Sequence, residues 1–321
     1  MSPAVSAEQL VYGPVPSRRL GRSLGVDLVP FKTCTYDCVY CQLGRTTRKT
    51  VRRQRCVDPS DVVAQVRAKL ESQPDVIAHA GSGEPTLHGG IGDVIAGIKR
   101  LTDVPVAVIT NGSLLSRPTV RRGLAAADIV LPSLDAPDDG LFRLVNRPHT
   151  ALDFANVVGG MTAFRNGYRG QLWLEVMLLA GVRGMVAEVE RLAELAARIA
   201  PDRIQLNTAV RPPAESFVAP VADNSLQEFA GLFTPHAEVI AGTVPAGGGR
   251  VAARADILAL LSRRPCTVAD IAAGLGIHHG EALKAASQLV TEGAVELYTH
   301  EDRSFYVATP ATLEIREEER S

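Results

Sequence analysis

The sequence of 321 residues predicts an α/β protein in which a partial (β/α) barrel is followed by a second, smaller domain. Between residues 23 and 240, short and almost continuously apolar runs alternate with stretches that carry apolar residues at helical spacing. After residue 250 the order changes to helical stretches followed by two β-rich runs. A chain of this length exceeds what one hydrophobic core ordinarily supports, so two domains are expected.

Six segments have the composition of buried strands: residues 23–30, 76–81, 104–110, 129–135, 172–179 and 203–207. Strands that are apolar along their whole length are typical of parallel sheets covered by helices on both faces. Five segments between them have helical periodicity: residues 60–72, 91–102, 119–127, 152–167 and 186–200. Six strands favour a partial barrel over a closed one of eight strands, with its site at the carboxyl ends of the strands.

The domain boundary is expected within residues 208–250, where prolines and then Gly247-Gly248-Gly249 interrupt the alternation. The predicted divisions are a barrel domain at 1–240, a glycine-rich linker at 241–250, a second domain at 251–308 and a tail at 309–321.

The second domain has three helical segments and then two strands around a polar turn: residues 253–264, 267–276, 279–293 and 294–308. Thr267 is the expected N-cap of the middle helix, with Asp270 three residues later. Three helices followed by a hairpin are typical of a winged helix-turn-helix.

Composition and charge exclude several classes of protein. The chain is 46% hydrophobic and 21% charged, which excludes a disordered chain, and its formal net charge of −1 gives no global attraction to nucleic acid or anionic membranes. We find no apolar run of the length of a signal peptide or a membrane span, so a cytoplasmic protein without a membrane partner is expected.

Three of the five cysteines, Cys34, Cys38 and Cys41, fall within eight residues directly after the first predicted strand. In a reducing compartment such crowding indicates metal binding and not a disulfide framework. Three thiolates can bind a cubane iron–sulfur cluster and leave one iron open to a small molecule. A zinc site would need a fourth ligand, and no histidine occurs before residue 79. Cys56 and Cys266 lack partner spacing and are expected to be ordinary thiols.

The spacing Cys-x-x-x-Cys-x-x-Cys, with Tyr40 before the last cysteine, resembles the signature of the radical S-adenosylmethionine (SAM) superfamily. The resemblance implies a [4Fe–4S] cluster on the three cysteines, with SAM on the open iron. It also implies reductive cleavage of SAM to a 5′-deoxyadenosyl radical that abstracts hydrogen. It places Tyr40 near the adenine of SAM.

The end of the second predicted strand, Gly81-Ser82-Gly83-Glu84-Pro85, resembles the Gly-Gly-Glu-Pro element of the same family. The resemblance implies that this segment binds SAM, with Glu84 receiving the methionyl ammonium. Glycines let the backbone approach a ligand closely, and a carboxylate suits an ammonium. Ser82 changes the usual spacing of the glycines. The alternative is an ordinary turn between a strand and a helix.

Polar residues also follow or occupy the later strands: Asn111, Ser133, Asp135, Glu175, Gln205 and Asn207. A polar group in an apolar strand must find a partner, either a ligand or a neighbour in the protein. The resemblance implies SAM contacts for Ser133 and Asp135, and Asn111 is a further candidate. For Asn111, Glu175 and Asn207 a structural hydrogen bond is an equal alternative. No residue is assigned to catalysis on the substrate.

The opening residues 11–30 and the stretch 31–44 are similar to iron–sulfur oxidoreductases related to wyosine-type tRNA base-forming enzymes. A tRNA-modifying enzyme is therefore one alternative. Six positive charges between Arg45 and Arg55 suit RNA phosphates, or a solvated surface. Arg18, Arg19 and Arg22 suit an anionic substrate group, or surface salt bridges. The substrate stays open among a peptide or protein, tRNA and a small molecule, and an external electron donor of the flavodoxin or ferredoxin type is expected.

The last predicted helix, residues 279–293, carries only Lys284 as a permanent positive charge against Glu281 and Glu292, which disfavours binding to duplex DNA. We therefore expect the second domain to position a macromolecular partner, or to be a structural cap, with no part in radical generation. The alternative from another class is an iron–sulfur sensor that regulates transcription through this domain. A sensor would not need the SAM-binding elements after the cysteines.

Overall fold

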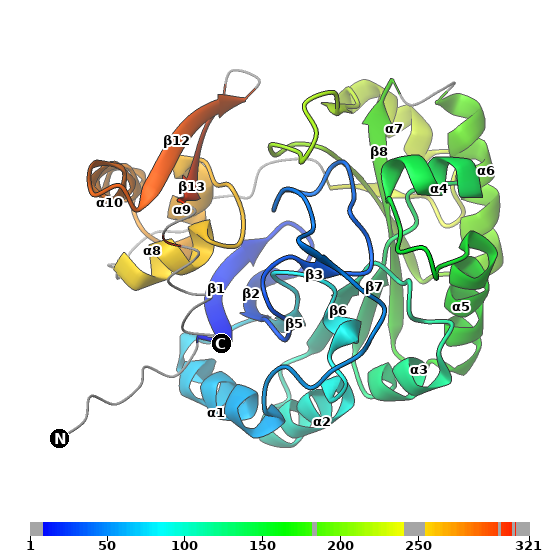
Figure 1. The fold of residues 1–321 in the computed structure, drawn as a ribbon, viewed down its shortest axis with the longest axis horizontal. Helices are drawn as coiled ribbons and strands as arrows, with labels where there is room; N and C mark the ends of the chain where they lie inside the picture. Colours follow the sequence, from blue (N-terminus) through cyan, green and yellow to red (C-terminus); the bar gives the residue numbers. More distant parts are fainter. Residues whose placement is uncertain (1–8, 182–184, 241–253, 301–302, 310–311, 313–321) are drawn as a thin grey trace.

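The computed structural model describes residues 9–181, 185–240, 254–300, 303–309 and 312. Its centre is one curved sheet whose strands run in the order β1-β2-β5-β6-β7-β8-β9-β11, with β10 paired to β8 (Figure 1). Neighbours from β2 to β11 along this path are parallel, while β1 is antiparallel to β2. The strands are β1 (Val11–Ser17), β2 (Gly21–Val26), β5 (Val76–His79), β6 (Val106–Thr110), β7 (Ile129–Pro132), β8 (Gln171–Ala180), β9 (Arg203–Thr208), β10 (Ala219–Pro220) and β11 (Glu238–Val239).

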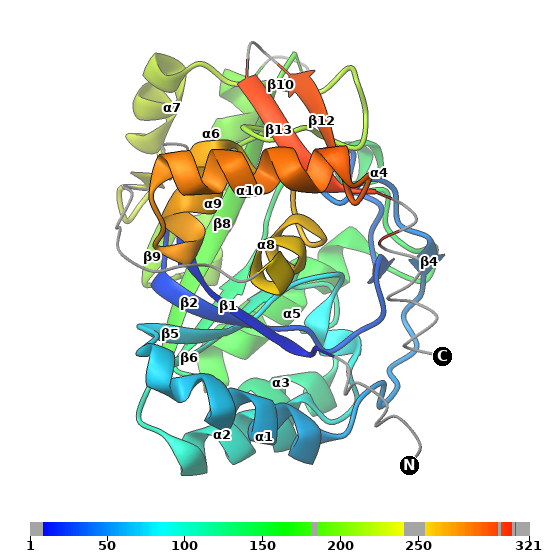
Figure 2. The ribbon, with the colours of Figure 1, turned by 90° about the vertical axis from the view of Figure 1, so that its left-hand side faces the viewer.

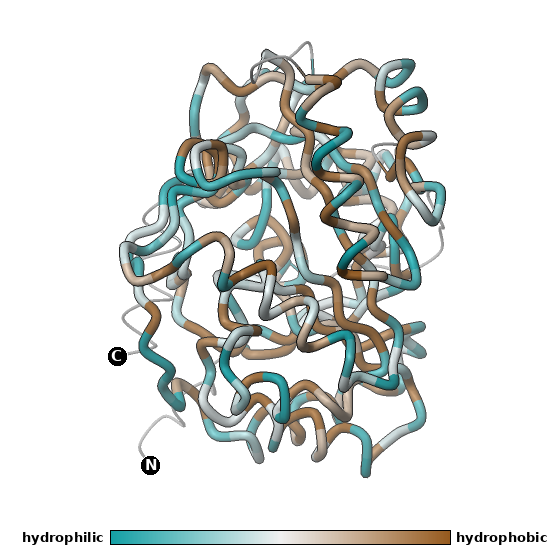
Figure 3. The backbone as a smooth tube through the Cα atoms, turned by 90° about the vertical axis from the view of Figure 1, so that its right-hand side faces the viewer, coloured by the Kyte–Doolittle hydropathy of each residue, from teal (hydrophilic) through white to brown (hydrophobic). Residues whose placement is uncertain are grey.

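Helices cover the outer face of this sheet (Figure 1). They are α1 (Pro59–Lys69), α2 (Ile91–Leu101), α3 (Pro118–Leu124), α4 (Asp139–Val145), α5 (Phe154–Gly167), α6 (Val186–Ile199) and α7 (Asp223–Ala230), with short 3₁₀ turns η1 (Leu70–Ser72) and η2 (Pro85–Leu87). In α2, for example, Ile91, Val94 and Ile98 are buried while Lys99 and Arg100 complete the last turn. Figure 3 views the helical side and shows hydrophobic and hydrophilic stretches alternating along the tube. Among the described helices, none has the length and apolarity needed to cross a bilayer.

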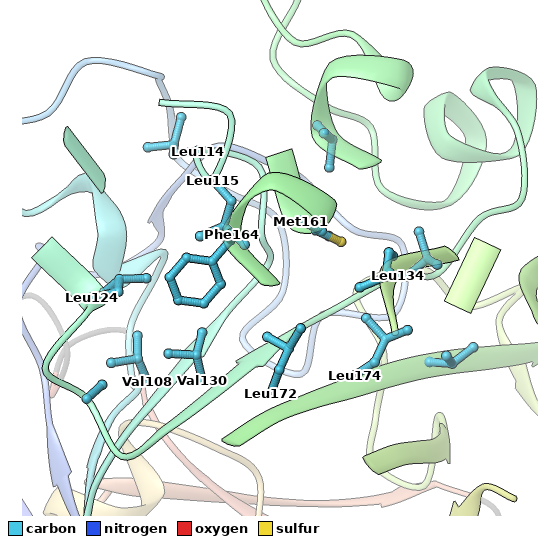
Figure 4. Packing of buried hydrophobic residues seen from close by; sticks show 14 of the residues in the cluster. Val108, Leu114, Leu115, Leu124, Val130, Leu134, Met161, Phe164, Leu172 and Leu174 are labelled. Atoms are coloured by element: carbon cyan, nitrogen blue, oxygen red, sulfur yellow. The ribbon is translucent and has the colours of Figure 1, made fainter. Parts of the chain in front are cut away.

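The core lies between the sheet and these helices. Figure 4 shows Val108, Val130 and Leu172 of three adjacent strands beside Phe164 and Met161 of α5, and all five side chains are buried. Burying an aliphatic or aromatic side chain of this size contributes about 1.5–3 kcal/mol. The α/β fold with a mostly parallel sheet is therefore confirmed, because all six predicted strands and all five predicted helices are present.

The inner face of the sheet differs from the outer face in composition. Gly25, Ala78, Ser133, Glu175 and Asn207 all line a cavity there. Small and polar side chains cannot fill the curve of a sheet as leucine and valine do, so space remains for a ligand.

Strand β1 was not expected from the sequence. It contains Pro14 and Pro16, which ordinarily count against a strand, and its pairing with β2 is irregular between Tyr12 and Val15. Proline is tolerated here because β1 is an edge strand of the sheet. A Cβ atom on Gly25 would lie 2.0 Å from Cζ of Tyr12, so only glycine leaves room for the ring of Tyr12 on the inner face.

Residues 254–308 form three helices followed by a hairpin, in the predicted order. These are α8 (Arg254–Leu261), α9 (Val268–Leu275), α10 (His279–Thr291), β12 (Val295–His300) and β13 (Arg303–Ala308). Thr267 and Asp270 form the predicted capping box at the start of α9. The winged-helix assignment stays a prediction. The predicted linker 241–250 lies outside the described residues, as does most of the predicted tail.

This second unit packs against the edge of the barrel. Figure 2 shows α8 and α9 in front of β1 and β2, and Val15 packs against the core of the second unit. The guanidinium of Arg263 lies 4.0 Å from the ring centroid of Tyr12, and its Nη2 donates to the carbonyl of Gln9 at 3.1 Å. The segment around β1 is therefore in direct contact with the second unit.

Candidate active site

The cavity on the inner face of the sheet has a volume of about 390 Å³. Its wall comes from three parts of the chain: the strand ends, the loop that carries the cysteines, and the second unit. Of the residues predicted to bind metal or SAM, those on the wall are Cys34, Cys38, Tyr40, Cys41, Gly81, Gly83, Glu84, Asn111 and Ser133.

The cysteine loop begins at the short pair formed by β3 (Thr33–Cys34) and β4 (Arg48–Lys49). Two backbone hydrogen bonds fix it to the end of α4, from Asp37 N to the carbonyl of Asn146 and from Val39 N to that of Val145. The ring of Tyr36 is buried beneath the loop, edge-on to Phe142 at 5.3 Å. These contacts hold the loop so that Cys34, Cys38 and Cys41, all free thiols, face one cavity.

The donor set fits an iron–sulfur cluster. Three soft thiolates on one loop face the same cavity, and in a cubane cluster each thiolate binds a different iron. Two amides also donate to the sulfurs, Asn111 Nδ2 to Cys34 and Asn146 Nδ2 to Cys38, both at 3.5 Å. Hydrogen bonds to the ligating sulfurs help to set the potential of such clusters.

Asn146 was not found from the sequence, and it connects the cysteine loop to Asp135. Asp135 accepts hydrogen bonds from Tyr40 Oη at 2.5 Å, Asn146 Nδ2 at 2.8 Å and Met177 N at 3.1 Å. Burial raises the pKa of Asp135 to about 6, although these donors favour its charged form. Asp135 therefore holds Tyr40 in place, and neither Asp135 nor Pro85 is among the residues that line the cavity. A direct contact of either residue with SAM stays a prediction.

The glycines of the predicted SAM-binding turn have a structural reason. A Cβ atom on Gly83 would lie 2.0 Å from the carbonyl oxygen of Thr33, and one on Gly81 would lie 2.8 Å from Cγ of Asp27. The same Asp27 accepts hydrogen bonds from the backbone and the hydroxyl of Ser82. The turn is thus packed directly against the loop that leads to the first cysteine.

Glu84 is 2% exposed and already has four donors within the protein. Its Oε1 accepts from Thr86 N at 3.0 Å, Thr86 Oγ1 at 2.5 Å and Thr110 Oγ1 at 2.6 Å, and its Oε2 accepts from Asn111 N at 2.7 Å. Burial raises the pKa of Glu84, and the four donors act against that shift. The carboxylate therefore ties the end of β5 to the end of β6, and its contact with the methionyl ammonium stays a prediction.

Replacing Glu84 with alanine is expected to lower the free energy of unfolding by at least about 3 kcal/mol, because several buried donors would lose their acceptor. Urea denaturation followed by circular dichroism measures this loss, and Glu71→Ala, at an exposed site in η1, is the control. If Glu84→Ala weakened SAM binding while unfolding like the wild type, the carboxylate would serve the cofactor alone.

The polar residues of the last strands partner one another. Glu175 forms an ion pair with Arg19 and accepts a hydrogen bond from Asn207 Nδ2 at 2.9 Å. For these two residues the structural alternative therefore holds. The side chain of Gln205 is not on the cavity wall, and its buried Oε1 has no partner among the described residues.

The second unit contributes Leu260, Arg263, Arg264 and Asp270 to the cavity wall. That this unit takes no part in radical generation stays a prediction, although its side chains line the same cavity as the cysteines. Arg263 Nε lies 3.8 Å from Oδ2 of Asp27, the carboxylate that holds Ser82 in the predicted SAM-binding turn. Sequence patterns cannot reveal this contact, because periodicity reports only on neighbours along the chain.

The basic run between Arg45 and Arg55 is partly used by the protein itself. Arg53 donates to the carbonyls of Thr86 and His88 at 2.8 and 2.9 Å. Arg45 pairs with Glu215, and Arg55 pairs with Asp93. Arg48, Lys49 and Arg52 are exposed, although Arg48 donates to Oε1 of Gln54 at 3.3 Å and Lys49 to the carbonyl of Arg147 at 3.1 Å. RNA binding by this run stays a prediction, and fewer than the six cations are left without a partner in the protein to support it.

Comparison with known proteins agrees with this geometry. Residues 28–196 match the family model of the radical SAM superfamily. A GTPase Obg of Brachyspira hyodysenteriae is 36% identical over 295 residues, which is 89% of this chain, and the chain spans 43% of that protein. A UPF0026 protein of Methanocaldococcus jannaschii is 37% identical, and the match covers 66% of this chain and 67% of that protein. A UPF0026 protein of Helicobacter pylori J99 is 32% identical, and the match covers 90% of this chain and 97% of that protein.

Solved structures show the same fold. A radical SAM methyltransferase from Sphaerobacter thermophilus has a TM-score of 0.51 at 18% identity, covering 68% of this chain and 65% of that chain. SuiB of Streptococcus suis has a TM-score of 0.51 at 13% identity, covering 69% of this chain and 49% of that chain. These identities support the fold alone, and the wyosine-type subgroup stays a prediction. The family model, however, covers over half of the chain, which therefore belongs to the radical SAM superfamily and has UPF0026 proteins among its relatives.

Proposed function

We propose that the protein cleaves SAM reductively at a [4Fe–4S] cluster held by Cys34, Cys38 and Cys41, and that the 5′-deoxyadenosyl radical abstracts hydrogen from a substrate in the same cavity. The reaction takes place in the cytoplasm, with one electron from a donor of the flavodoxin or ferredoxin type. Bound there, the cluster would supply that electron to the sulfonium, so that SAM separates into methionine and the radical.

One observation carries the proposal: the three thiols, the turn at Gly81–Glu84 and Tyr40 line one cavity. A purely structural cluster would need neither the glycine turn nor an aromatic side chain beside it. Bound by these three thiols, a cluster would leave one iron for a ligand in the cavity where these elements meet, and that cavity suits a small molecule.

The chain's own residues have positioning roles in this scheme. Asp135 and Asn146 fix Tyr40 and Cys38, so the adenine side of the cavity is preorganised before SAM binds. Arg19 and Asn207 keep Glu175 paired at the inner wall, so that this carboxylate is compensated without a ligand. The second unit forms part of the cavity wall and so reduces access of water to the radical.

Anaerobic reconstitution with iron and sulfide, followed by SAM and dithionite, is expected to produce 5′-deoxyadenosine, which chromatography detects. Omitting the reductant is the control, because cleavage needs an electron. A protein that carries a full complement of iron and binds SAM, but forms no 5′-deoxyadenosine, would contradict the proposal and would favour the iron–sulfur sensor.

A further inference from the structure

Five arginines line the cavity: Arg18 and Arg19 in the turn between β1 and β2, Arg211 after β9, and Arg263 and Arg264 after α8. Arg19 is paired with Glu175, and Arg211 lies 3.9 Å from Oδ1 of Asp270. In the described part of the chain, no carboxylate lies within 4.0 Å of Arg18 or Arg264. The wall thus carries more positive charge than its own carboxylates neutralise.

These arginines are largely buried, and burying a charged group costs free energy. The side chain of Arg211 is 15% exposed, and the Nε atoms of Arg211 and Arg264 are buried without a hydrogen-bond partner among the described residues. Burial, followed by the nearby charges of Arg264 and Arg18, lowers the pKa of Arg211 to about 10. Burial and Arg19 lower that of Arg18 to about 10. Arg18 and Arg211 therefore remain charged near neutral pH, so two like charges lie in the same wall.

The arginines also lie beside the cysteine loop. Arg211 Nη1 donates to Oε1 of Gln42, the residue directly after Cys41, at 3.3 Å. Arg18 Nη1 donates to the carbonyl of Ile240 at 2.8 Å, which ties the β1–β2 turn to the residue after β11. Asp270 is fixed by Thr267 N at 3.0 Å and Thr267 Oγ1 at 2.9 Å. The arginine positions are therefore set by contacts from both units before any ligand arrives.

We propose that Arg18, Arg211 and Arg264 bind the anionic group, a phosphate or a carboxylate, of a small-molecule substrate. The inference rests on the proposed function for the chemistry that follows binding. Guanidinium groups are planar forks that match the oxygens of both anions. A small molecule fits because the second unit forms part of the cavity wall and the cavity has the size of small-molecule sites, roughly 300–1,000 Å³.

This site gives the second unit a definite role. Arg264 and Asp270 come from it, while Arg18 and Arg211 come from the barrel. The second unit then completes the substrate site directly, whereas a domain that only recruits a partner would leave these side chains on an open surface.

The test is isothermal titration of the reconstituted protein, in buffer without phosphate or sulfate, with inorganic phosphate and separately with succinate. We expect one of the two to bind, and Arg264→Gln to weaken that binding at least about tenfold, since a charge-assisted hydrogen bond is lost. Arg198→Gln, at an exposed position of α6, should bind as the wild type does. Thermal melting shows whether each variant is folded. The anion that binds more tightly identifies the substrate's anionic group.

Two results would overturn the inference, whether or not the protein forms 5′-deoxyadenosine. One is that neither anion binds with a Kd below about 10 mM, and the other is that a folded Arg264→Gln binds as tightly as the wild type. Binding of tRNA that depends on Arg264, without binding of either small anion, would replace the small molecule with a nucleic acid. Conversely, anion binding that depends on Arg264, in a protein that cleaves no SAM, would retain the site and reject the radical chemistry.

Discussion

Replacing Cys34, Cys38 and Cys41 together with alanine is expected to remove bound iron and reduce 5′-deoxyadenosine formation to background. The three thiols face one cavity and supply all of the sulfur ligands of the proposed cluster, so no ligand would remain in the loop. Iron content and the charge-transfer absorption of anaerobically purified protein measure the first effect, and chromatography measures the second.

Cys56→Ala is the matched control for this experiment. Cys56 is exposed and does not line the cavity, so its loss should leave iron content and product formation at wild-type levels. Circular dichroism shows whether the triple variant is folded. If the folded triple variant kept its iron and its absorption, the cluster would be bound elsewhere.

The second large effect is expected for Arg263→Ala. Arg263 is 8% exposed, lies over the ring of Tyr12 and approaches Asp27, which is 3% exposed. Removing the cation leaves a buried carboxylate without its charge partner, a change that typically costs 3–5 kcal/mol. The free energy of unfolding in urea should fall by about that amount, and SAM should bind more weakly, because Asp27 also holds Ser82.

Arg198→Ala is the control for Arg263→Ala, because it removes an exposed arginine from a helix that does not contact the cavity. Arg263→Lys retains a charge but loses the flat guanidinium, so a partial loss is expected. If Arg263→Ala unfolded at the same urea concentration as the wild type, the contact between the two units would not stabilise the fold.

The helices and strands that the sequence predicts best are those whose pattern lies within a few neighbouring residues. The apolar run at 104–110 and the periodic stretch at 91–102 correspond to β6 and α2 within two residues at each end. Strand β1 was missed because its prolines hide a strand that only an edge position and an irregular pairing allow. The helix α4, whose end fixes the cysteine loop, was also not predicted.

The residues of the candidate site can also be separated into those that the sequence reveals and those that it does not. The cysteines and the glycine turn could be found because their spacing along the chain has a chemical meaning. Asn146, Arg211 and Arg263 could not be found, because each acts through a partner that is distant in sequence: Cys38, Gln42 and Tyr12. A lone asparagine or arginine has no recognisable pattern until the fold brings it to its partner.

The contact of Arg263 with Gln9, 254 positions apart, has a consequence for biosynthesis. Ribosomes release the chain from its N-terminus, so β1 emerges long before α8 and α9 can cover it. The three cysteines and the glycine turn leave the ribosome in between. Assembly of the proposed iron–sulfur cluster can therefore precede completion of the arginine pocket, because the second unit adds its part of the cavity wall only after its helices have docked.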